Sequence, residues 1–181
     1  MRKRIPNIIT LLRFFIAILF VVLYVNDDIV VATVSFFIAA ATDILDGWLA
    51  RKMNVVSTWG ALYDPLADKV LTSAAFILFA ITGIVEIWMV LVIIFRDIIT
   101  TATRAIYFST KKIRTSFTAK IKTFLQMIFI FFVLVLQCLE KKEIIYSDLI
   151  YYAMLIITIL TFWTMLEYIF QVYHLKKEDK K

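Results

Sequence analysis

The chain has 181 residues, of which 62% are hydrophobic and only 3 are glycine and 2 are proline. Its mean hydropathy is +0.89, whereas a soluble domain is about half apolar, so the composition argues against a soluble protein and predicts an all-α, polytopic membrane protein with a single domain over residues 1–181. The net charge of +6 comes from basic residues at the ends of apolar runs, which favours contact with membrane lipids and argues against a nucleic-acid partner.

Six apolar stretches are long enough to cross a bilayer, which takes about 20 helical residues. They do not alternate apolar and polar residues as transmembrane β-strands do, so six transmembrane helices are expected. In chain order, these helices are predicted at residues 5–25, 29–50, 58–82, 85–108, 117–139 and 147–173.

Lysine and arginine residues are unevenly divided between the two ends of these helices, and the more basic side of a membrane protein faces the cytoplasm. One side carries Arg2, Lys3, Arg4, Arg51, Lys52, Lys111, Lys112, Arg114, Lys176, Lys177, Lys180 and Lys181. The other side carries Lys141 and Lys142 beside Glu140 and Glu143. We therefore expect a multi-pass protein of the cell's inner (plasma) membrane, with both termini and the segment after Arg51 on the cytoplasmic side.

The first predicted helix carries Thr10 and Arg13 in an otherwise apolar stretch. The two residues are three positions apart and therefore share a helix face. Arg13 has two possible roles: its side chain reaches out to the membrane surface, or it binds an anionic group of a ligand.

Four aspartates lie at regular spacings in the second and third predicted helices. Asp43 and Asp46 are three residues apart, and Asp64 and Asp68 are four apart, so each pair shares a helix face. The segment between the pairs is short enough to reverse the chain, and two antiparallel helices would point both pairs into one cleft.

Ionisable groups at membrane depth are costly and therefore indicate function. Four neighbouring carboxylates repel one another, and one or two divalent cations would remove that repulsion. Carboxylates are the oxygen ligands that Mg²⁺ and Mn²⁺ prefer, and no histidine or cysteine is near to favour zinc. Two such ions would suit phosphoryl transfer. The alternatives are incidental acids paired with lysine or arginine, and a pathway for divalent ions.

Small residues accompany the aspartates. Gly47 and Ala50 leave one helix face smooth, and Gly60 lies one turn before Asp64. Such residues let a bulky ligand approach the backbone, and Arg51 can pair with a phosphate group.

The complete pattern is D-x-x-D-G-x-x-A-R-x8-G-x-x-x-D-x-x-x-D from Asp43 to Asp68. It resembles the signature of the CDP-alcohol phosphotransferase family at every specified position. The resemblance implies that family's fold and an attack by an alcohol on the lipid-side phosphorus of a CDP-linked lipid, with release of CMP. It also implies two Mg²⁺ or Mn²⁺ ions on Asp43, Asp46, Asp64 and Asp68, with Asp68 as general base. The residues implied in CDP binding are Asp43, Gly47, Ala50, Arg51 and Gly60.

Other stretches are similar to the phosphatidylglycerophosphate synthase branch of that family. They are the N-terminal Ile5 to Arg13, Arg96-Asp97 with Arg104 eight residues after Arg96, and Lys120-Ile-Lys122-Thr. Asp97 stands where this branch often has glutamate, and Ala119 where glycine is usual. The acceptor phosphate would then be bound by Thr10, Arg13, Arg96, Arg104, Lys120 and Lys122. Arg96 could instead form a structural pair with Asp97, and the lysines could be interfacial.

These resemblances imply transfer of a phosphatidyl group from CDP-diacylglycerol to sn-glycerol 3-phosphate. The alternatives are the same chemistry with inositol phosphate or serine as acceptor, and a divalent-ion transporter. The expected partners are the two substrates, membrane lipids and a second copy of the chain, because relatives are commonly dimeric.

Overall fold

A computed structural model describes residues 5–53, 60–106 and 117–178, with side chains at 14–42, 69–103, 118, 120–170 and 172. The regular elements in these ranges are all helices, which confirms the all-α prediction. They are α1 (Ile5–Val25), α2 (Ile29–Met53), α3 (Gly60–Ile81), α4 (Ile87–Ile106), α5 (Phe117–Cys138), α6 (Lys142–Ile145) and α7 (Asp148–Glu178). The six long helices coincide closely with the six predicted stretches, and the four-residue α6 was not predicted.

Two helical stretches in the described residues, Lys120–Cys138 and Lys142–Phe170, are long and apolar enough to cross a membrane. Shorter apolar stretches lie in α1, α2 and α3, at Phe14–Val25, Ile29–Thr42 and Lys69–Ile81.

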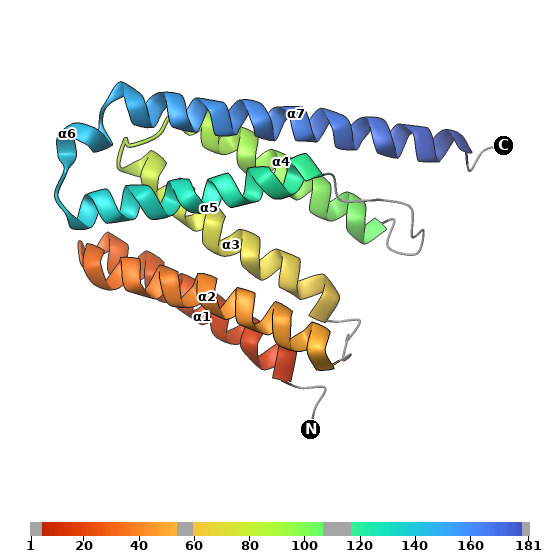
Figure 1. Cartoon of the computed structure of the whole chain (residues 1–181), viewed down its shortest axis with the longest axis horizontal. Helices are drawn as coiled ribbons and strands as arrows, with labels where there is room; N and C mark the ends of the chain where they lie inside the picture. The colour runs from red at the N-terminus through yellow and green to blue at the C-terminus, as the bar shows by residue number, and fades with distance from the viewer. Residues whose placement is uncertain (1–4, 54–59, 107–116, 179–181) are drawn as a thin grey trace.

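The helices run roughly along one axis in alternating directions (Figure 1). Consequently the start of α1, the end of α2, the start of α3 and the end of α7 all lie at one end of the molecule. We call this end the motif end, because the helical parts of the aspartate pattern lie there. The first residues of α1 and the last residues of α7 therefore lie at the same end as the helical parts of the aspartate pattern (Figure 1).

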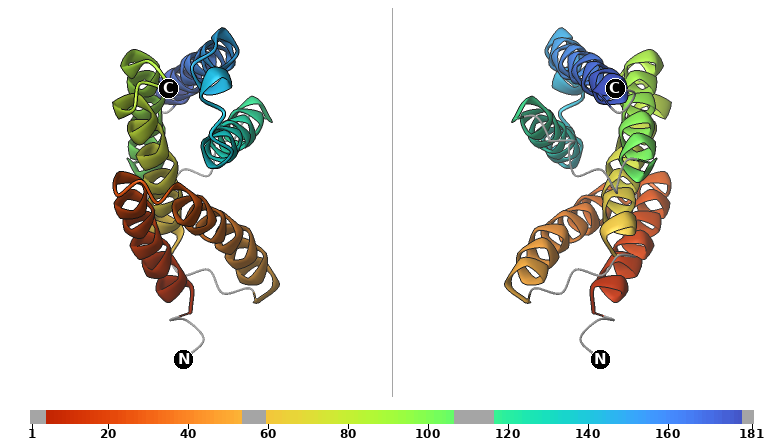
Figure 2. Two further views of the ribbon diagram at one scale, coloured as in Figure 1. Left: turned by 90° about the vertical axis from the view of Figure 1, so that its left-hand side faces the viewer. Right: turned by 90° about the vertical axis from the view of Figure 1, so that its right-hand side faces the viewer.

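Helices α1 and α2 form a hairpin that packs on α3, and α2 also contacts α5. Helices α3 and α7 each pack against both α4 and α5. In the described residues no Cα of α4 lies within 8 Å of a Cα of α5. Helices α4 and α5 thus lie on opposite sides of an interior bounded by α3 and α7, an arrangement that can be followed in the end views of Figure 2.

The sequence predicts breaks between helices at the end opposite the motif end. Two of the turns there use left-handed backbone conformations. Asp27 (φ 66°) follows α1 and Gly83 (φ 73°) follows α3. A left-handed residue just after a helix is a common way to satisfy its last carbonyl groups. Glu140 (φ 54°) does the same after α5.

The core is largely apolar but contains several buried polar and charged groups, and much of the exterior is apolar. Arg96, Asp97 and Lys122 are buried, whereas Phe124 and Phe170 are more than half exposed. Several buried threonine hydroxyls donate to carbonyl groups of their own helix: Thr100 to Arg96, Thr158 to Met154, Thr161 to Ile157 and Thr164 to Thr161. An apolar exterior around buried polar groups is what a lipid environment requires.

Aromatic packing holds α1 against its neighbours. The ring of Phe20 is completely buried, 5.4 Å from the ring of Phe36 on α2 and 6.0 Å from that of Tyr24. Alanines such as Ala32 and Ala39 are also fully buried and let neighbouring helices approach closely.

We predict that Phe20→Ala destabilises the protein by about 3–5 kcal/mol, because the truncated ring leaves a cavity between α1 and α2. Phe15→Ala on the same helix should cost far less, since Phe15 is 61% exposed. Thermal unfolding of both variants in detergent measures the difference. Equal effects would contradict this packing.

Candidate active site

The aspartate pattern occupies two helix ends. Asp43 and Asp46 lie in the second half of α2, and Asp64 and Asp68 lie in the first half of α3. These segments are helical, as predicted, so within each pair the residues are about one turn apart. Both segments lie at the motif end of the molecule (Figure 1).

Several predicted site residues have side chains outside the described set, so their contacts stay predictions. These residues are Thr10, Arg13, Asp43, Asp46, Gly47, Ala50, Arg51, Gly60, Asp64, Asp68 and Arg104. All of them fall within described helices, namely α1, α2, α3 and α4.

A buried ionic cluster joins α3, α4 and α5. We call Lys69, Arg96, Asp97 and Lys122 the Asp97 cluster. Oδ1 of Asp97 accepts hydrogen bonds from Nη1 of Arg96 at 2.8 Å and from Nζ of Lys122 at 3.1 Å. The exposed fractions of these three residues are 7%, 8% and 2% for Arg96, Asp97 and Lys122. Two residues predicted to bind the acceptor phosphate, Arg96 and Lys122, are therefore brought together by one carboxylate.

Lys69 attaches α3 to α4. Its Nζ donates to the main-chain oxygen of Asp97 at 2.9 Å, and it also bonds the hydroxyls of Thr100, at 3.4 Å, and Thr101. The sequence analysis did not single out Lys69, although a lysine directly after Asp68 in an apolar stretch is a recognisable signal. This contact fixes α3 beside α4 one residue from the candidate general base.

The cluster has more positive than negative charge and unused donors. Arg96 and Lys122 share one carboxylate, that of Asp97, and Nε of Arg96 has no hydrogen-bond partner among the described residues. Gln126, one turn after Lys122, is also buried, and its Nε2 lacks a partner there. Leaving a buried donor unpaired costs about 1–3 kcal/mol. Such an interior can bind an anion.

The two lysines of α5 lie in different surroundings. Lys120 is exposed, whereas Lys122 is in the Asp97 cluster. Near Lys120, the hydroxyl of Thr118 donates to Oε2 of Glu167 on α7 at 2.9 Å. The two lysines are thus not equivalent, and Lys122 is the one held in the interior.

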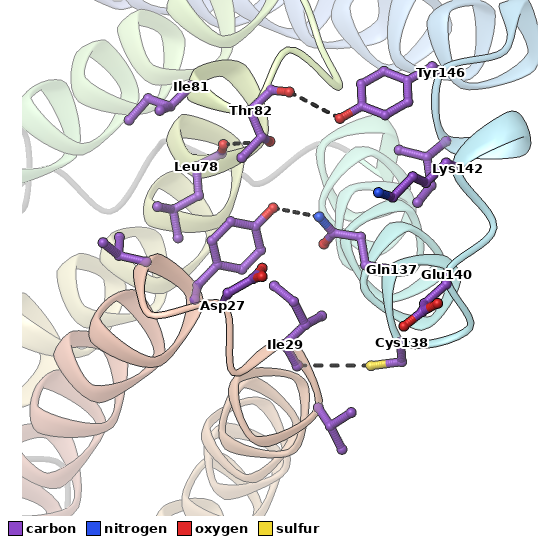
Figure 3. A pocket seen from close by; sticks show the side chains of 14 residues that line it. Asp27, Ile29, Leu78, Ile81, Thr82, Gln137, Cys138, Glu140, Lys142 and Tyr146 are labelled. Atoms are coloured by element: carbon purple, nitrogen blue, oxygen red, sulfur yellow. Dashed lines mark hydrogen bonds between the residues drawn. The ribbon is translucent and has the colours of Figure 1, made fainter.

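A separate pocket of about 730 Å³ opens at the opposite end of the molecule (Figure 3). Gln137 Nε2 donates to the hydroxyl of Tyr24 at 2.7 Å, and the hydroxyl of Tyr146 donates to the carbonyl oxygen of Thr82 at 3.3 Å. Ile29, which lines the pocket, is about 21 Å along α2 from Asp43 at 1.5 Å per residue. This pocket therefore does not contain the aspartate pattern.

Comparison with known proteins identifies relatives over most of the chain. The family model described as CDP-alcohol phosphatidyltransferase matches residues 3–168. The CDP-diacylglycerol--glycerol-3-phosphate 3-phosphatidyltransferase of Bacillus subtilis is 32% identical over 175 residues, covering 87% of this chain and 91% of that protein. The protein of the same name from Pseudomonas fluorescens is 34% identical over 189 residues, covering 98% and 94%. The one from Mycoplasma genitalium is 29% identical, covering 95% and 85%.

We predict that Lys122→Met lowers stability by about 1–3 kcal/mol, because it removes a charged partner of the buried Asp97 carboxylate. Lys120→Met, two residues away and exposed, should change stability by less than about 0.5 kcal/mol. Thermal unfolding of both variants in one detergent compares them. A loss of stability in Lys120→Met as large as in Lys122→Met would contradict the arrangement of α5.

Proposed function

This chain belongs to the CDP-alcohol phosphatidyltransferase family, and on that premise we propose that it transfers a phosphatidyl group from CDP-diacylglycerol to sn-glycerol 3-phosphate. The products are phosphatidylglycerophosphate and CMP. The observation that carries the proposal is the shared name of relatives aligned over most of the chain, including those from B. subtilis and P. fluorescens. The excess positive charge of the Asp97 cluster supports an acceptor that carries a phosphate.

The family uses divalent metal ions, and we propose that Asp43, Asp46, Asp64 and Asp68 hold two Mg²⁺ or Mn²⁺. The donor set fits, because four carboxylates on two helix ends provide the oxygen ligands these ions require. The side chains that the structure describes do not include these four aspartates, and they form no group of three or more His, Cys, Asp or Glu that could hold a metal. Bound ions would neutralise the pyrophosphate and the charge on departing CMP.

The carboxylate of Asp68 is proposed to take the proton from the acceptor hydroxyl. The resulting oxygen nucleophile forms a bond to the lipid-side phosphorus, and the bond from that phosphorus to the CMP oxygen breaks. Before the reaction, Gly47, Ala50 and Gly60 would leave room for the nucleotide beside the backbone. Arg51 would pair with its phosphate, and Asp43 would also contact the CDP group.

The acceptor phosphate is proposed to bind where α1, α4 and α5 carry cations. The residues are Thr10, Arg13, Arg96, Arg104, Lys120 and Lys122. Among these residues, Arg96 and Lys122 are buried and bond the same carboxylate, that of Asp97. A guanidinium group and an ammonium group both suit phosphate oxygens.

We further propose that the six long helices span the membrane as one domain, with both termini and the active site on the cytoplasmic side. The apolar exterior and the basic residues near the motif end support this orientation. That side supplies glycerol 3-phosphate, while the acyl chains of CDP-diacylglycerol stay in the bilayer. A homodimer is the proposed assembly.

The first experiment measures CMP release from CDP-diacylglycerol in detergent with Mg²⁺, adding glycerol 3-phosphate, inositol phosphate or serine separately. We expect release with glycerol 3-phosphate alone. Release with a different acceptor would keep the chemistry and change the substrate. Metal flux in proteoliposomes without CMP release would favour the transporter.

Asp68→Asn should lower the CMP release rate by at least about 100-fold, because the amide cannot accept the acceptor's proton. Asp27→Asn is the matched control: Asp27 is exposed and lies at the other end of the molecule. An Asp68→Asn protein that is folded and as active as the parent would exclude Asp68 as the base.

Removal of divalent ions with a chelator should abolish CMP release, because the pyrophosphate charge would no longer be neutralised. Added Mg²⁺ or Mn²⁺ should restore the activity. Full activity in the chelated protein, with metal content checked by elemental analysis, would contradict the proposed metal site.

A further inference from the structure

We propose that Asp97 is a positioning residue for the acceptor site, directing Arg96 and Lys122 toward the acceptor phosphate without contacting the substrate itself. This inference rests on the proposed function and deepens it. A positioning role for Asp97 explains why a carboxylate, which repels phosphate, lies among cations that are proposed to bind a phosphate group.

The side chain of Lys122 needs a partner that orients it toward the interior. It extends from α5, and no Cα of α4 lies within 8 Å of that helix in the described residues. Nevertheless its Nζ reaches Oδ1 of Asp97, 3.1 Å away on α4. A lysine side chain has many rotamers, and fixing one of them costs conformational entropy. The carboxylate of Asp97 provides a charged acceptor that selects the rotamer pointing into the interior.

The carboxylate occupies only part of the binding capacity of its two partners. Arg96 uses Nη1 for Asp97, while its Nε is buried without a partner among the described residues. The ammonium group of Lys122 has three donors, of which one is directed at Asp97. Both cations therefore keep donors for a ligand while their positions are fixed.

Charge balance leads to the same conclusion. Arg96 and Lys122 contribute two positive charges and share the one negative charge of Asp97. Asp97 therefore reduces the repulsion between these two cations but leaves these three groups with an excess of one positive charge, which suits an anionic phosphate. With a neutral side chain at position 97, the cations would repel one another and move apart.

Substitution at position 97 should act locally. Lys69 binds the main-chain oxygen of Asp97, so Asp97→Asn retains the acceptor that attaches α3 to α4. The variant therefore tests the carboxylate rather than the helix packing.

The test is steady-state CMP release by the full-length protein in detergent, with each substrate varied in turn. We expect Asp97→Asn to raise the KM for glycerol 3-phosphate about tenfold, as for the loss of one charged hydrogen bond. The KM for CDP-diacylglycerol should stay within about twofold. Asp97→Glu, which keeps the charge, should recover most of the loss.

Thr161→Val is the matched control, because Thr161 is fully buried and its hydroxyl bonds within α7. Neither KM should change in this variant. An unchanged KM for glycerol 3-phosphate in Asp97→Asn would overturn the proposal. So would an equal rise in both KM values, which indicates a structural role alone.

A double variant keeps the proposal testable if Asp97→Asn does not fold. Lys122→Met with Asp97→Asn removes both charges of one pair, which is less costly than leaving one partner buried alone. If Asp97 acts through Lys122, the second substitution should add less than about twofold to the KM of Lys122→Met. A further tenfold rise would show that Asp97 does not act through Lys122 and would overturn the proposal for that residue.

A binding measurement separates this inference from the proposed function. If the parent protein does not use glycerol 3-phosphate, the proposed function fails. Inorganic phosphate is then the probe, and the phosphate concentration giving half of the maximal thermal stabilisation is compared between parent and Asp97→Asn. A rise of about tenfold supports the positioning role, and equal concentrations overturn it.

Discussion

The carboxylate of Asp97 is the interaction on which the interior of this protein depends. A buried cation without a partner is costly, and this interior holds an arginine and two lysines from three helices. Asp97 makes that arrangement possible because Oδ1 serves both Arg96 and Lys122, while its main-chain oxygen serves Lys69. One residue thus links α3, α4 and α5.

The same constraint connects the fold to the chemistry. Lys69 adjoins Asp68 in the sequence and bonds to α4, so the helix that carries the candidate base is attached to the helix that carries Arg96. The proposed metal site and the proposed acceptor site are consequently connected through α3 and α4. Meanwhile the large apolar side chains, such as Phe124 and Phe170, face outward, where acyl chains of a lipid substrate can approach.

Much of the architecture followed from the sequence because each long helix is an apolar run bounded by polar turns. The aspartate pattern was equally visible, since fixed spacing places its residues on defined helix faces. Features that depend on tertiary contacts were harder to predict from the sequence. The pairing of Arg96 with Asp97 was one of two readings, and the distinction between Lys120 and Lys122 depends on which face of α5 turns inward. Lys69 was missed because its partners, Thr100 and Thr101, are about thirty residues away in the sequence.

The buried threonines have a consequence for motion. Thr158 and Thr161 donate within their own helix, so these hydrogen bonds set no register between α7 and its neighbours. Lys122 on α5 and Asp97 on α4 form a polar contact between these two helices. A change in the separation of α4 and α5 would alter this contact without breaking a backbone hydrogen bond of either helix. The Lys122–Asp97 contact is therefore a point at which the spacing of these two helices can adjust.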